Sequence, residues 1–453
     1  MNKTSKDERL FGTDGIRGRY GEGWLTTGTV SALGRAIGVV LSRKNGGRAG
    51  KALVGHDGRR SGPTLEAALT RGLSSAGYSV TSVGVITTPG LAVLGRLQGF
   101  DLAVMISASH NPAEDNGIKI FSASGDKLPD ATEDEVEAEL RARPAALEEG
   151  PAPTSDPTLE NLYLNHLLSS VEGLKLDGLA IVIDCANGGG SRIAPRILGR
   201  LGAQVVSLAS SPDGDNINQA CGSTHPGGLQ EAVRLHGADF GIALDGDGDR
   251  CILVDEQGAL VNGDAILTLL ARDRMQRGTL LDPRIVATVM SNLGLHRAMR
   301  AAGVQVVTVG VGDRRVVEAL QRENLNLGGE QSGHVVFGPE NFYIGDGIYT
   351  ALRVLQVLRG RKARLSELAS AYRPFPQVLI NVPVEKKPNL SEVPAVMDEV
   401  RRIEDQLGED GRVLLRYSGT EPLARVMVEG PDEVQIRACA QELANRIAQE
   451  IGA

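Results

Sequence analysis

The sequence predicts an α/β protein with three consecutive, similar α/β domains of mixed, mainly parallel sheets and a smaller C-terminal α+β domain. Two observations predict this class. A chain of 453 residues is too long for one hydrophobic core and suits roughly three or four domains of ~100–150 residues each. Short apolar runs also alternate with amphipathic segments over most of the chain, a pattern typical of helices that cover a parallel sheet.

The first domain, predicted over residues 1–157, has the order strand, helix, strand, helix, strand. The strands are expected at 52–55, 79–85 and 102–106. A helix with capping residues starts at Ser61, and a turn at Thr88–Gly90 leads into the second helix. Residues 143–157 concentrate prolines and acidic side chains, which disfavour regular structure and predict a linker.

The next two domains, predicted over 158–260 and 261–373, repeat the alternation. Their strands are expected at 178–184, 204–208, 240–244, 284–289 and 303–309, with a helix from Asp313. The last segment, 374–453, differs because it reads strand, helix, strand, strand, helix. That order predicts a smaller α+β domain with an antiparallel pair.

Composition restricts the possible partners. Charged residues make up 23% and apolar residues 41% of the chain, as in ordinary soluble proteins. A net charge of -8 argues against nucleic acid and anionic membranes, which bind clustered Lys and Arg. The N-terminus lacks an apolar core of signal-peptide length, and the four cysteines have no C-x-x-C spacing. We expect a cytoplasmic protein with reduced thiols.

A loop rich in polar residues follows the strand that ends at Ile106. It contains Ser107, Ser109 and His110 before an Asn-Pro break. Ligands of open α/β sheets bind at the carboxyl ends of strands, so the loop is a candidate active site. Serines after a strand are nevertheless more often caps or turn residues than nucleophiles.

The strongest chemical signal is the sequence Asp245-Gly-Asp-Gly-Asp-Arg250. Its glycines allow a tight loop in which Asp245, Asp247 and Asp249 converge, and converging carboxylates need a cation to remain ionised. Oxygen ligands favour Mg²⁺ or Ca²⁺ over zinc. The competing interpretation, a solvated acidic turn, is uncommon after a core strand.

Three further polar motifs could serve a phosphorylated sugar. Gly328–His334 offers a carboxylate, a hydroxyl and an imidazole, which suit sugar hydroxyls. Arg416–Glu421 offers a guanidinium, hydroxyls and an accessible backbone N–H for a phosphate. Arg17 lies between small residues in Phe11–Gly18 and could reach an anion. For the first two motifs, a bare turn is the alternative.

Taken together, five motifs resemble those of the α-D-phosphohexomutase family in order and spacing. They are Phe11–Gly18, Ser107–Pro112, Asp245–Arg250, Gly329–His334 and Arg416–Pro422. Within the family, Gly12–Gly18 and Ile106–Pro112 are similar to the glucosamine branch. That resemblance implies the interconversion of glucosamine 6-phosphate and glucosamine 1-phosphate, in the amino sugar metabolism that supplies cell wall precursors.

The resemblance also implies a role for each matching residue. Ser109 would be the phosphoserine, while Lys119, from the same loop, and Arg17 would assist proton transfer and charge stabilisation. One Mg²⁺ per subunit would be held by Ser109, Asp245, Asp247 and Asp249. The substrate would be bound by Arg250, Glu330, Ser332, His334, Arg416, Ser418, Gly419 and Thr420.

The expected reaction passes through a 1,6-bisphosphate, because phosphoserine donates one phosphoryl group and then accepts the other. His110 is expected to be only a supporting contact, since neighbouring side chains in extended chain point oppositely. Sites on four domains imply a central cleft that excludes water. The C-terminal domain should close over the substrate about a hinge near Tyr372–Gln377, and a homodimer would fit the resemblance.

Three alternatives remain open at this level. The chain could prefer another hexose phosphate, as a phosphomannomutase or a phosphoglucomutase does. It could be a metal-dependent phosphatase. It could also be a non-catalytic sugar-phosphate-binding protein, for which the acidic loop and the Arg416 loop would suffice but a phosphorylated Ser109 would have no use.

Overall fold

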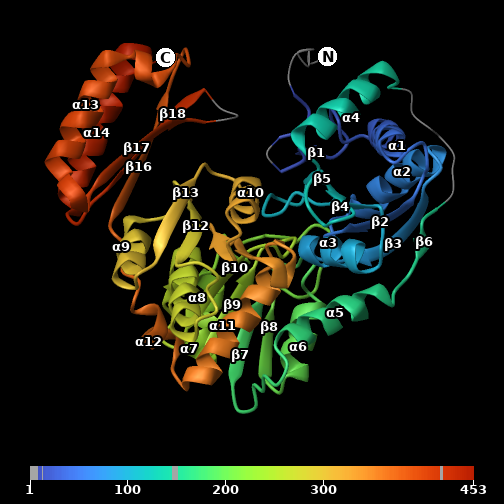
Figure 1. The fold of residues 1–453 in the computed structure, drawn as a ribbon, viewed down its shortest axis with the longest axis horizontal. Helices are drawn as coiled ribbons and strands as arrows, with labels where there is room; N and C mark the ends of the chain where they lie inside the picture. The colour runs from blue at the N-terminus through green and yellow to red at the C-terminus, as the bar shows by residue number, and fades with distance from the viewer. Residues whose placement is uncertain (1–8, 13, 145–151, 419–421, 453) are drawn as a thin grey trace. The chain divides into compact units, whose positions relative to one another are not determined.

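A computed structural model describes residues 9–12, 14–144, 152–418 and 422–452 (Figure 1). The chain separates into two compact units. The larger contains the chain up to Thr288 together with Val307–Ala371, and the smaller contains Val289–Val306 together with the chain from Tyr372 onward. Among the described residues, no helix combines the length and apolarity needed to cross a membrane.

The first sheet of the larger unit has six strands in the order β1-β5-β4-β2-β3-β6. They are β1 (Ile16–Arg19), β2 (Lys51–His56), β3 (Ser79–Val85), β4 (Leu102–Ile106), β5 (Asp115–Ser122) and β6 (Thr154–Ser155). Its helices are α1 (Thr27–Lys44), α2 (Gly62–Ser75), α3 (Thr88–Leu97) and α4 (Asp130–Ala142). Apolar residues of α1, α2 and α4 share one buried core with the sheet.

This domain confirms the three predicted strands, contains one edge that was not predicted and corrects three local predictions. The edge formed by β1 and β5 is antiparallel and was not expected. Thr88–Gly90 is the first turn of α3, capped by Thr87, rather than a free turn. Part of the predicted linker pairs with β3 as the short strand β6. Ser61 precedes α2 without capping it, because its hydroxyl accepts a hydrogen bond from Asn116 instead.

The second sheet has the order β11-β10-β9-β7-β8, with a parallel β9-β7-β8 core and an antiparallel edge. Its strands are β7 (Ala180–Asp184), β8 (Gln204–Leu208), β9 (Phe240–Leu244), β10 (Cys251–Asp255) and β11 (Leu260–Val261). The accompanying helices are α5 (Leu159–Ser170), α6 (Ile193–Arg200) and α7 (Gly227–His236). All three predicted strands are present.

The third sheet has the order β13-β12-β14-β15. Its strands are β12 (Arg284–Thr288), β13 (Gln305–Val309), β14 (Leu327–Gly329) and β15 (Val335–Phe337). The helices in this part of the chain are α8 (Gly263–Arg277), α9 (Leu293–Ala301), α10 (Asp313–Glu323), α11 (Gly347–Arg361) and α12 (Leu365–Ala369). Helix α10 begins at the predicted residue. Helix α9 belongs to the smaller compact unit.

The smaller unit contains an antiparallel sheet of β16 (Gln377–Pro383), β18 (Leu423–Glu429) and β17 (Arg412–Tyr417), in that order. Helices α13 (Pro394–Leu407) and α14 (Glu433–Ile451) share a buried apolar core with it. Asn292 caps α9 and also donates to Glu429 on β18, which ties that helix to this unit. The predicted order of elements is confirmed, with three antiparallel strands instead of two.

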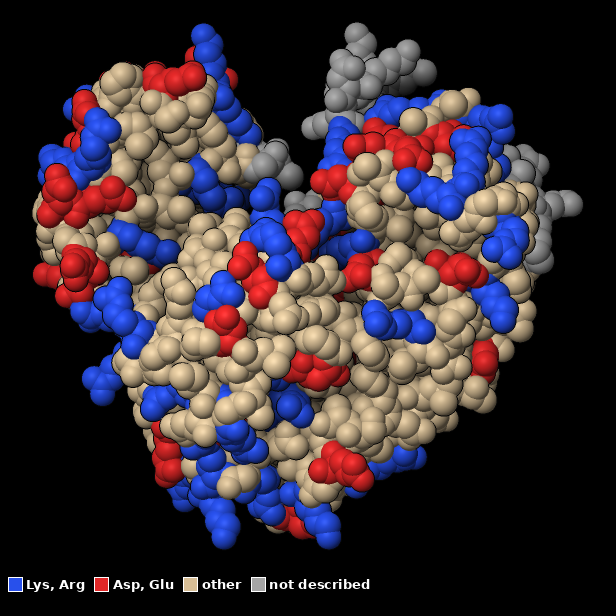
Figure 2. All heavy atoms as spheres, viewed as in Figure 1, with Lys and Arg blue, Asp and Glu red and all other residues tan. Residues whose placement is uncertain are grey.

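Charge on the molecular surface is mixed. On the face drawn in Figure 2, basic and acidic side chains are interspersed among uncharged surface.

Candidate active site

Ser109 follows the C-terminal end of β4, where the sequence predicts a site. Its side chain is buried at 1% exposure, and its hydroxyl donates to Asp245 Oδ2 over 2.8 Å. The backbone of Ser109 has φ 52°, a left-handed conformation that is uncommon for residues other than glycine. Strained backbone of this kind is found mainly where surrounding contacts impose it, often at functional sites.

This backbone conformation contradicts the orientation expected for His110. The expectation that His110 points away from Ser109 assumed extended chain, whereas the left-handed turn brings His110 Nδ1 to 3.3 Å from Ser109 Oγ. Burial, reinforced by the guanidinium groups of Arg250 and Arg17, lowers the pKa of His110 to about 4. His110 is therefore a neutral imidazole at pH 7, in hydrogen-bonding range of the serine hydroxyl.

The three aspartates that follow β9 converge as predicted. One carboxylate oxygen from each of Asp245, Asp247 and Asp249 lies within 4.8 Å of the others, and all three side chains are buried. Asp247 Oδ1 and Asp249 Oδ1 are buried without a hydrogen-bond partner. Buried carboxylate oxygens that lack donors fit a hard divalent cation, which prefers oxygen ligands.

A glycine between the aspartates allows the loop to approach Ser109 closely. A Cβ atom placed on Gly246 would lie 2.6 Å from the Ser109 carbonyl oxygen. From the first domain, the Thr88 hydroxyl donates to Asp247 Oδ2 at 2.5 Å and the Thr88 amide to the Asp247 carbonyl at 2.8 Å. The helix start at α3 thus supports the acidic loop.

The carboxylates do not titrate alike. Burial, together with the neighbouring Asp249 and Asp247, raises the pKa of Asp245 well above its ordinary value. Burial would also raise the pKa of Asp249, but Lys119, His334 and Arg250 together outweigh burial, so this pKa lies well below its ordinary value. Mutual repulsion among the three carboxylates contributes to the raised pKa of Asp245, and a bound cation would relieve that repulsion.

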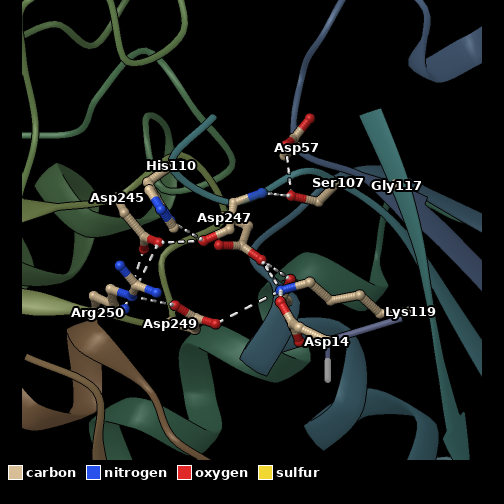
Figure 3. A network of polar contacts seen from close by, with 12 residues as sticks. Asp14, Asp57, Ser107, His110, Gly117, Lys119, Asp245, Asp247, Asp249 and Arg250 are labelled. Atoms are coloured by element: carbon tan, nitrogen blue, oxygen red, sulfur yellow. Dashed lines mark hydrogen bonds and ion pairs between the residues drawn. The ribbon is translucent and has the colours of Figure 1, made fainter. Parts of the chain in front are cut away.

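Lys119 extends into this cluster from β5 (Figure 3), not from the Ser109 loop as predicted. Strand β5 pairs antiparallel with β4, and this pairing returns the chain to the site. Lys119 Nζ lies 2.8 Å from Asp247, 2.9 Å from Asp14 and 3.7 Å from Asp249. The side chain is 1% exposed, and these carboxylates raise its pKa well above the ordinary value despite burial.

Arg17 reaches the same region through Asp14, a residue the sequence analysis did not select. Arg17 lies on β1 and forms an ion pair with Asp14. Asp14 also pairs with Lys127, which lies 2.5 Å from Asp313 at the start of α10. A chain of alternating charges therefore connects the third domain with Lys119. Thr13, in the same motif, lies outside the described residues.

The predicted sugar loop lies between β14 and β15 and meets the acidic cluster through His334. Its Nδ1 is 3.7 Å from Asp249 Oδ2, and Asp249 outweighs the effect of burial to raise the pKa of His334 to about 9. Glu330 Oε1 accepts from the Gly312 amide, while Ser332 is exposed. Arg250 Nε lies 3.9 Å from Asp249 and 4.0 Å from Asp245.

A pocket of about 310 Å³ adjoins the cluster and is lined on one side by Lys119, Asp249 and His334. The same larger unit therefore combines the serine, the carboxylates and space for a small ligand.

The predicted phosphate loop belongs to the smaller unit. Arg416 is the penultimate residue of β17, and Ser418 directly follows the strand at 3% exposure. Gly419 and Thr420 lie outside the described residues. Arg416 stands directly opposite Arg425 in the β17–β18 register, and burial together with Arg425 lowers the pKa of Arg416. Like charges directly opposite each other destabilise an antiparallel pair.

Sequence analysis missed the residues that support the Ser109 loop, namely Asp57, Arg59 and Asn218. Asp57 and Arg59 directly follow β2, and their place at a strand's carboxyl end is a signal that could have selected them. Asn218 lies in the long connection after β8, and nothing in its local sequence indicates a role at Ser109.

A buried serine hydroxyl that faces a cation-binding carboxylate cluster and a lysine is suited to phosphoryl transfer, which requires positioning and charge neutralisation. Comparison with known proteins agrees. The chain belongs to the phosphoglucomutase/phosphomannomutase family: models of its α/β/α domains I, II and III match residues 8–146, 161–258 and 262–375, and the C-terminal domain model matches 379–446.

Relatives of known name match over nearly their full length. The chain is 48% identical to phosphoglucosamine mutase from Symbiobacterium thermophilum, with 98% of this chain and 99% of the relative covered. It is 49% identical to phosphoglucosamine mutase from Rhodococcus opacus, covering 97% and 99%. A solved phosphoglucomutase/phosphomannomutase family protein from Burkholderia thailandensis superimposes with a TM-score of 0.81 at 26% identity, covering 98% and 97%.

Proposed function

We propose that this protein is a phosphoglucosamine mutase that interconverts glucosamine 6-phosphate and glucosamine 1-phosphate. The observation that carries the proposal is the buried Ser109 hydroxyl, 2.8 Å from Asp245 within the aspartate cluster. The full-length relatives named phosphoglucosamine mutase favour glucosamine over other hexoses.

The cation of this site is proposed to be Mg²⁺, one per subunit, because its donors are all oxygens. Asp245, Asp247 and Asp249 would hold it together with the phosphoryl group on Ser109. Its contribution would be to neutralise negative charge on the transferred group.

In the proposed reaction, phosphorylated Ser109 donates its group to the free O1 or O6 of the sugar monophosphate. The Oγ–phosphorus bond breaks as the sugar oxygen–phosphorus bond forms, and the proton of the sugar hydroxyl passes to Ser109 Oγ. The resulting 1,6-bisphosphate turns over, and its other phosphoryl group returns to Ser109. Lys119 and Arg17 stabilise the developing charge and assist the proton transfer.

Recognition of the sugar is assigned to Glu330, Ser332, His334 and Arg250, which lie on or beside the loop between β14 and β15. The non-reacting phosphate is assigned to Arg416, Ser418, Gly419 and Thr420. Arg425 supports that assignment because it adds a second guanidinium opposite Arg416. One loop can accept either end of the intermediate, since both ends are phosphates.

His110 is a better candidate for proton transfer than the sequence suggested. Its neutral imidazole lies 3.3 Å from Ser109 Oγ, slightly beyond the ~2.6–3.2 Å reach of a general base, a distance that commonly shortens when substrate binds. We therefore retain it among the proposed catalytic residues, beside Ser109, Lys119 and Arg17.

Several broader features accompany this proposal. The chain would keep four domains with boundaries near residues 157, 260 and 373, and the C-terminal domain would hinge near Tyr372–Gln377. The enzyme would work in the cytoplasm as a possible homodimer. Scattering curves that do not change with saturating substrate would contradict the closure.

The proposal is tested by intact-mass measurement and assay. The purified enzyme, incubated with glucosamine 1,6-bisphosphate and Mg²⁺, should gain the mass of one phosphoryl group, located on Ser109. The Ser109→Ala variant should lose both this modification and the activity. A fully active variant would falsify the scheme. kcat/KM measured on glucosamine, glucose and mannose phosphates distinguishes the sugar preferences.

A further inference from the structure

Both ends of the Ser109 residue are held by hydrogen bonds. The Ser109 amide donates to Ser107 Oγ at 2.8 Å, and Ser107 donates in turn to Asp57 Oδ2 at 2.6 Å. The Ser109 carbonyl accepts from Arg59 Nη2 at 3.0 Å and from Asn218 Nδ2 at 2.9 Å. These bonds determine the orientation of both peptide groups that flank the reactive side chain.

Arg59 is the largest fully buried side chain among the described residues, with 0% exposure. All five of its N–H donors have partners. Nε donates to Asp57 at 2.9 Å. The four Nη donors go to the carbonyls of Ser109, Asn111, Pro112 and Asp115, three of them at 2.9–3.0 Å. Every Nη donor therefore serves the turn that carries Ser109.

Burying a guanidinium is costly unless it is fully paired, so its placement calls for a reason. If Arg59 only stabilised the fold, its ion pair with Asp57 would be sufficient. Four carbonyls aimed at one cation instead define the shape of the turn, including the left-handed φ of 52° at Ser109. A bidentate fork is needed for this geometry, and lysine cannot supply it.

Asn218 repeats the same contacts from the second domain. Its Nδ2 donates to the carbonyls of Ser109 and Asn111, at 2.9 and 3.0 Å. These are the two carbonyls that Arg59 Nη2 also contacts. Asn218 itself has φ 58° and is held by its amide, which donates to the Ala186 carbonyl at 2.9 Å. The turn is therefore clamped between two domains.

We propose that Arg59 and Asn218 are positioning residues that hold Ser109 in line for phosphoryl transfer. This inference rests on the proposed function of Ser109 as the phosphoryl carrier. Neither side chain touches the reacting atoms. They act by keeping Ser109 Oγ directed at the acidic loop, where the Oγ–phosphorus bond forms as the sugar oxygen–phosphorus bond breaks and the serine proton passes to the sugar oxygen.

The test measures the phosphorylation half-reaction in Arg59→Lys and Asn218→Ala. Each full-length variant is mixed with saturating glucosamine 1,6-bisphosphate and Mg²⁺, and the single-turnover rate of Ser109 phosphorylation is followed by intact mass. A misplacement of about 1 Å costs on the order of 100-fold in rate, so we expect ~100-fold for Arg59→Lys and ~10-fold for Asn218→Ala. The Kd of glucosamine 6-phosphate should change less than about 3-fold, because neither side chain binds it.

Arg60→Ala is the matched control. Arg60 is the adjacent arginine, is exposed, and also links the first domain to the second through an ion pair with Asp215. Its loss should leave the half-reaction unchanged, because an exposed ion pair contributes little and Arg60 does not contact the Ser109 turn through its side chain.

The outcomes separate the two hypotheses. If wild-type enzyme gains no phosphoryl group on Ser109, the proposed function fails and this inference fails with it. If wild-type enzyme is phosphorylated but Asn218→Ala, folded by circular dichroism and thermal melting, reacts as fast as Arg60→Ala, the positioning role alone is refuted. If Arg59→Lys fails to fold, Asn218→Ala decides the question, since loss of two hydrogen bonds from one amide leaves the core intact.

Discussion

Replacing Lys119 by methionine tests how the charge of the acidic cluster is balanced. Lys119 Nζ lies 2.8 Å from Asp247 and 2.9 Å from Asp14, at 1% exposure. Removing one partner of a buried ion pair typically costs ~3–5 kcal/mol, because the remaining charge is left uncompensated. Methionine retains most of the apolar stem, so the loss is chiefly electrostatic. We expect K119M to lose about 3–5 kcal/mol of unfolding free energy in EDTA.

The assay is urea unfolding of wild type and variant, in EDTA and in saturating Mg²⁺. A divalent cation at the aspartates would replace part of the missing positive charge, so Mg²⁺ should stabilise K119M more than wild type. Lys127→Met is the control, since Lys127 pairs with Asp14 and Asp313. Mg²⁺ should stabilise that variant as much as wild type. Unfolding of K119M in EDTA within about 1 kcal/mol of wild type would refute the reasoning.

Three further predictions concern packing, helix capping and pH. Gly246→Ala should lower the unfolding free energy by ~1–3 kcal/mol and the activity by on the order of 100-fold, because the new Cβ meets the Ser109 carbonyl at 2.6 Å. Gly228→Ala, with nothing within 4 Å, should have neither effect; equal activity in the two variants contradicts the argument. Asn292→Ala removes the N-cap of α9 and a hydrogen-bond donor to Glu429, so the unfolding free energy of the smaller unit should fall by ~2 kcal/mol. Backbone amide hydrogens of this unit should then exchange faster with solvent. Unchanged exchange rates would count against this prediction. Burial, with Arg250 and Arg17, lowers the pKa of His110 from 6.5 to about 4. Between these two pH values the unfolded chain binds more protons at His110 than the folded chain, so the folded state loses stability as the pH falls. The His110→Gln variant should therefore lose less stability than wild type between pH 6.5 and 4. The urea unfolding midpoints of the two proteins are measured across this pH range, and an equal fall in both would exclude a contribution from His110.

Local sequence predicted the strands well where they are short apolar runs. β4 and β9 have the predicted bounds, because burial on both faces of the sheet requires an unbroken apolar run. β3 also has the predicted bounds, although its valines alternate with polar residues and glycine. Strand β5 was missed because Asn116 and Gly117 resemble a turn. Its pairing with β4 is a long-range choice that local propensity does not encode.

For the active site, the amino-acid sequence was sufficient to select the chemical groups and to indicate a cation site. Glycines between aspartates allow a tight loop, and carboxylates that must converge require a cation, so Asp245, Asp247 and Asp249 could be selected without coordinates. The place of Ser109 at the end of a buried strand was equally readable, since a strand's end follows from its apolar run.

Only the tertiary structure decided how these groups face one another. The left-handed conformation of Ser109, which turns His110 toward its hydroxyl, is held by Arg59 and Asn218. Those donors lie about fifty residues before Ser109 and more than a hundred after it, so no local pattern contains them. Side-chain direction at a strained residue depends on contacts across the fold, whereas the identity of a ligand depends on the residue alone.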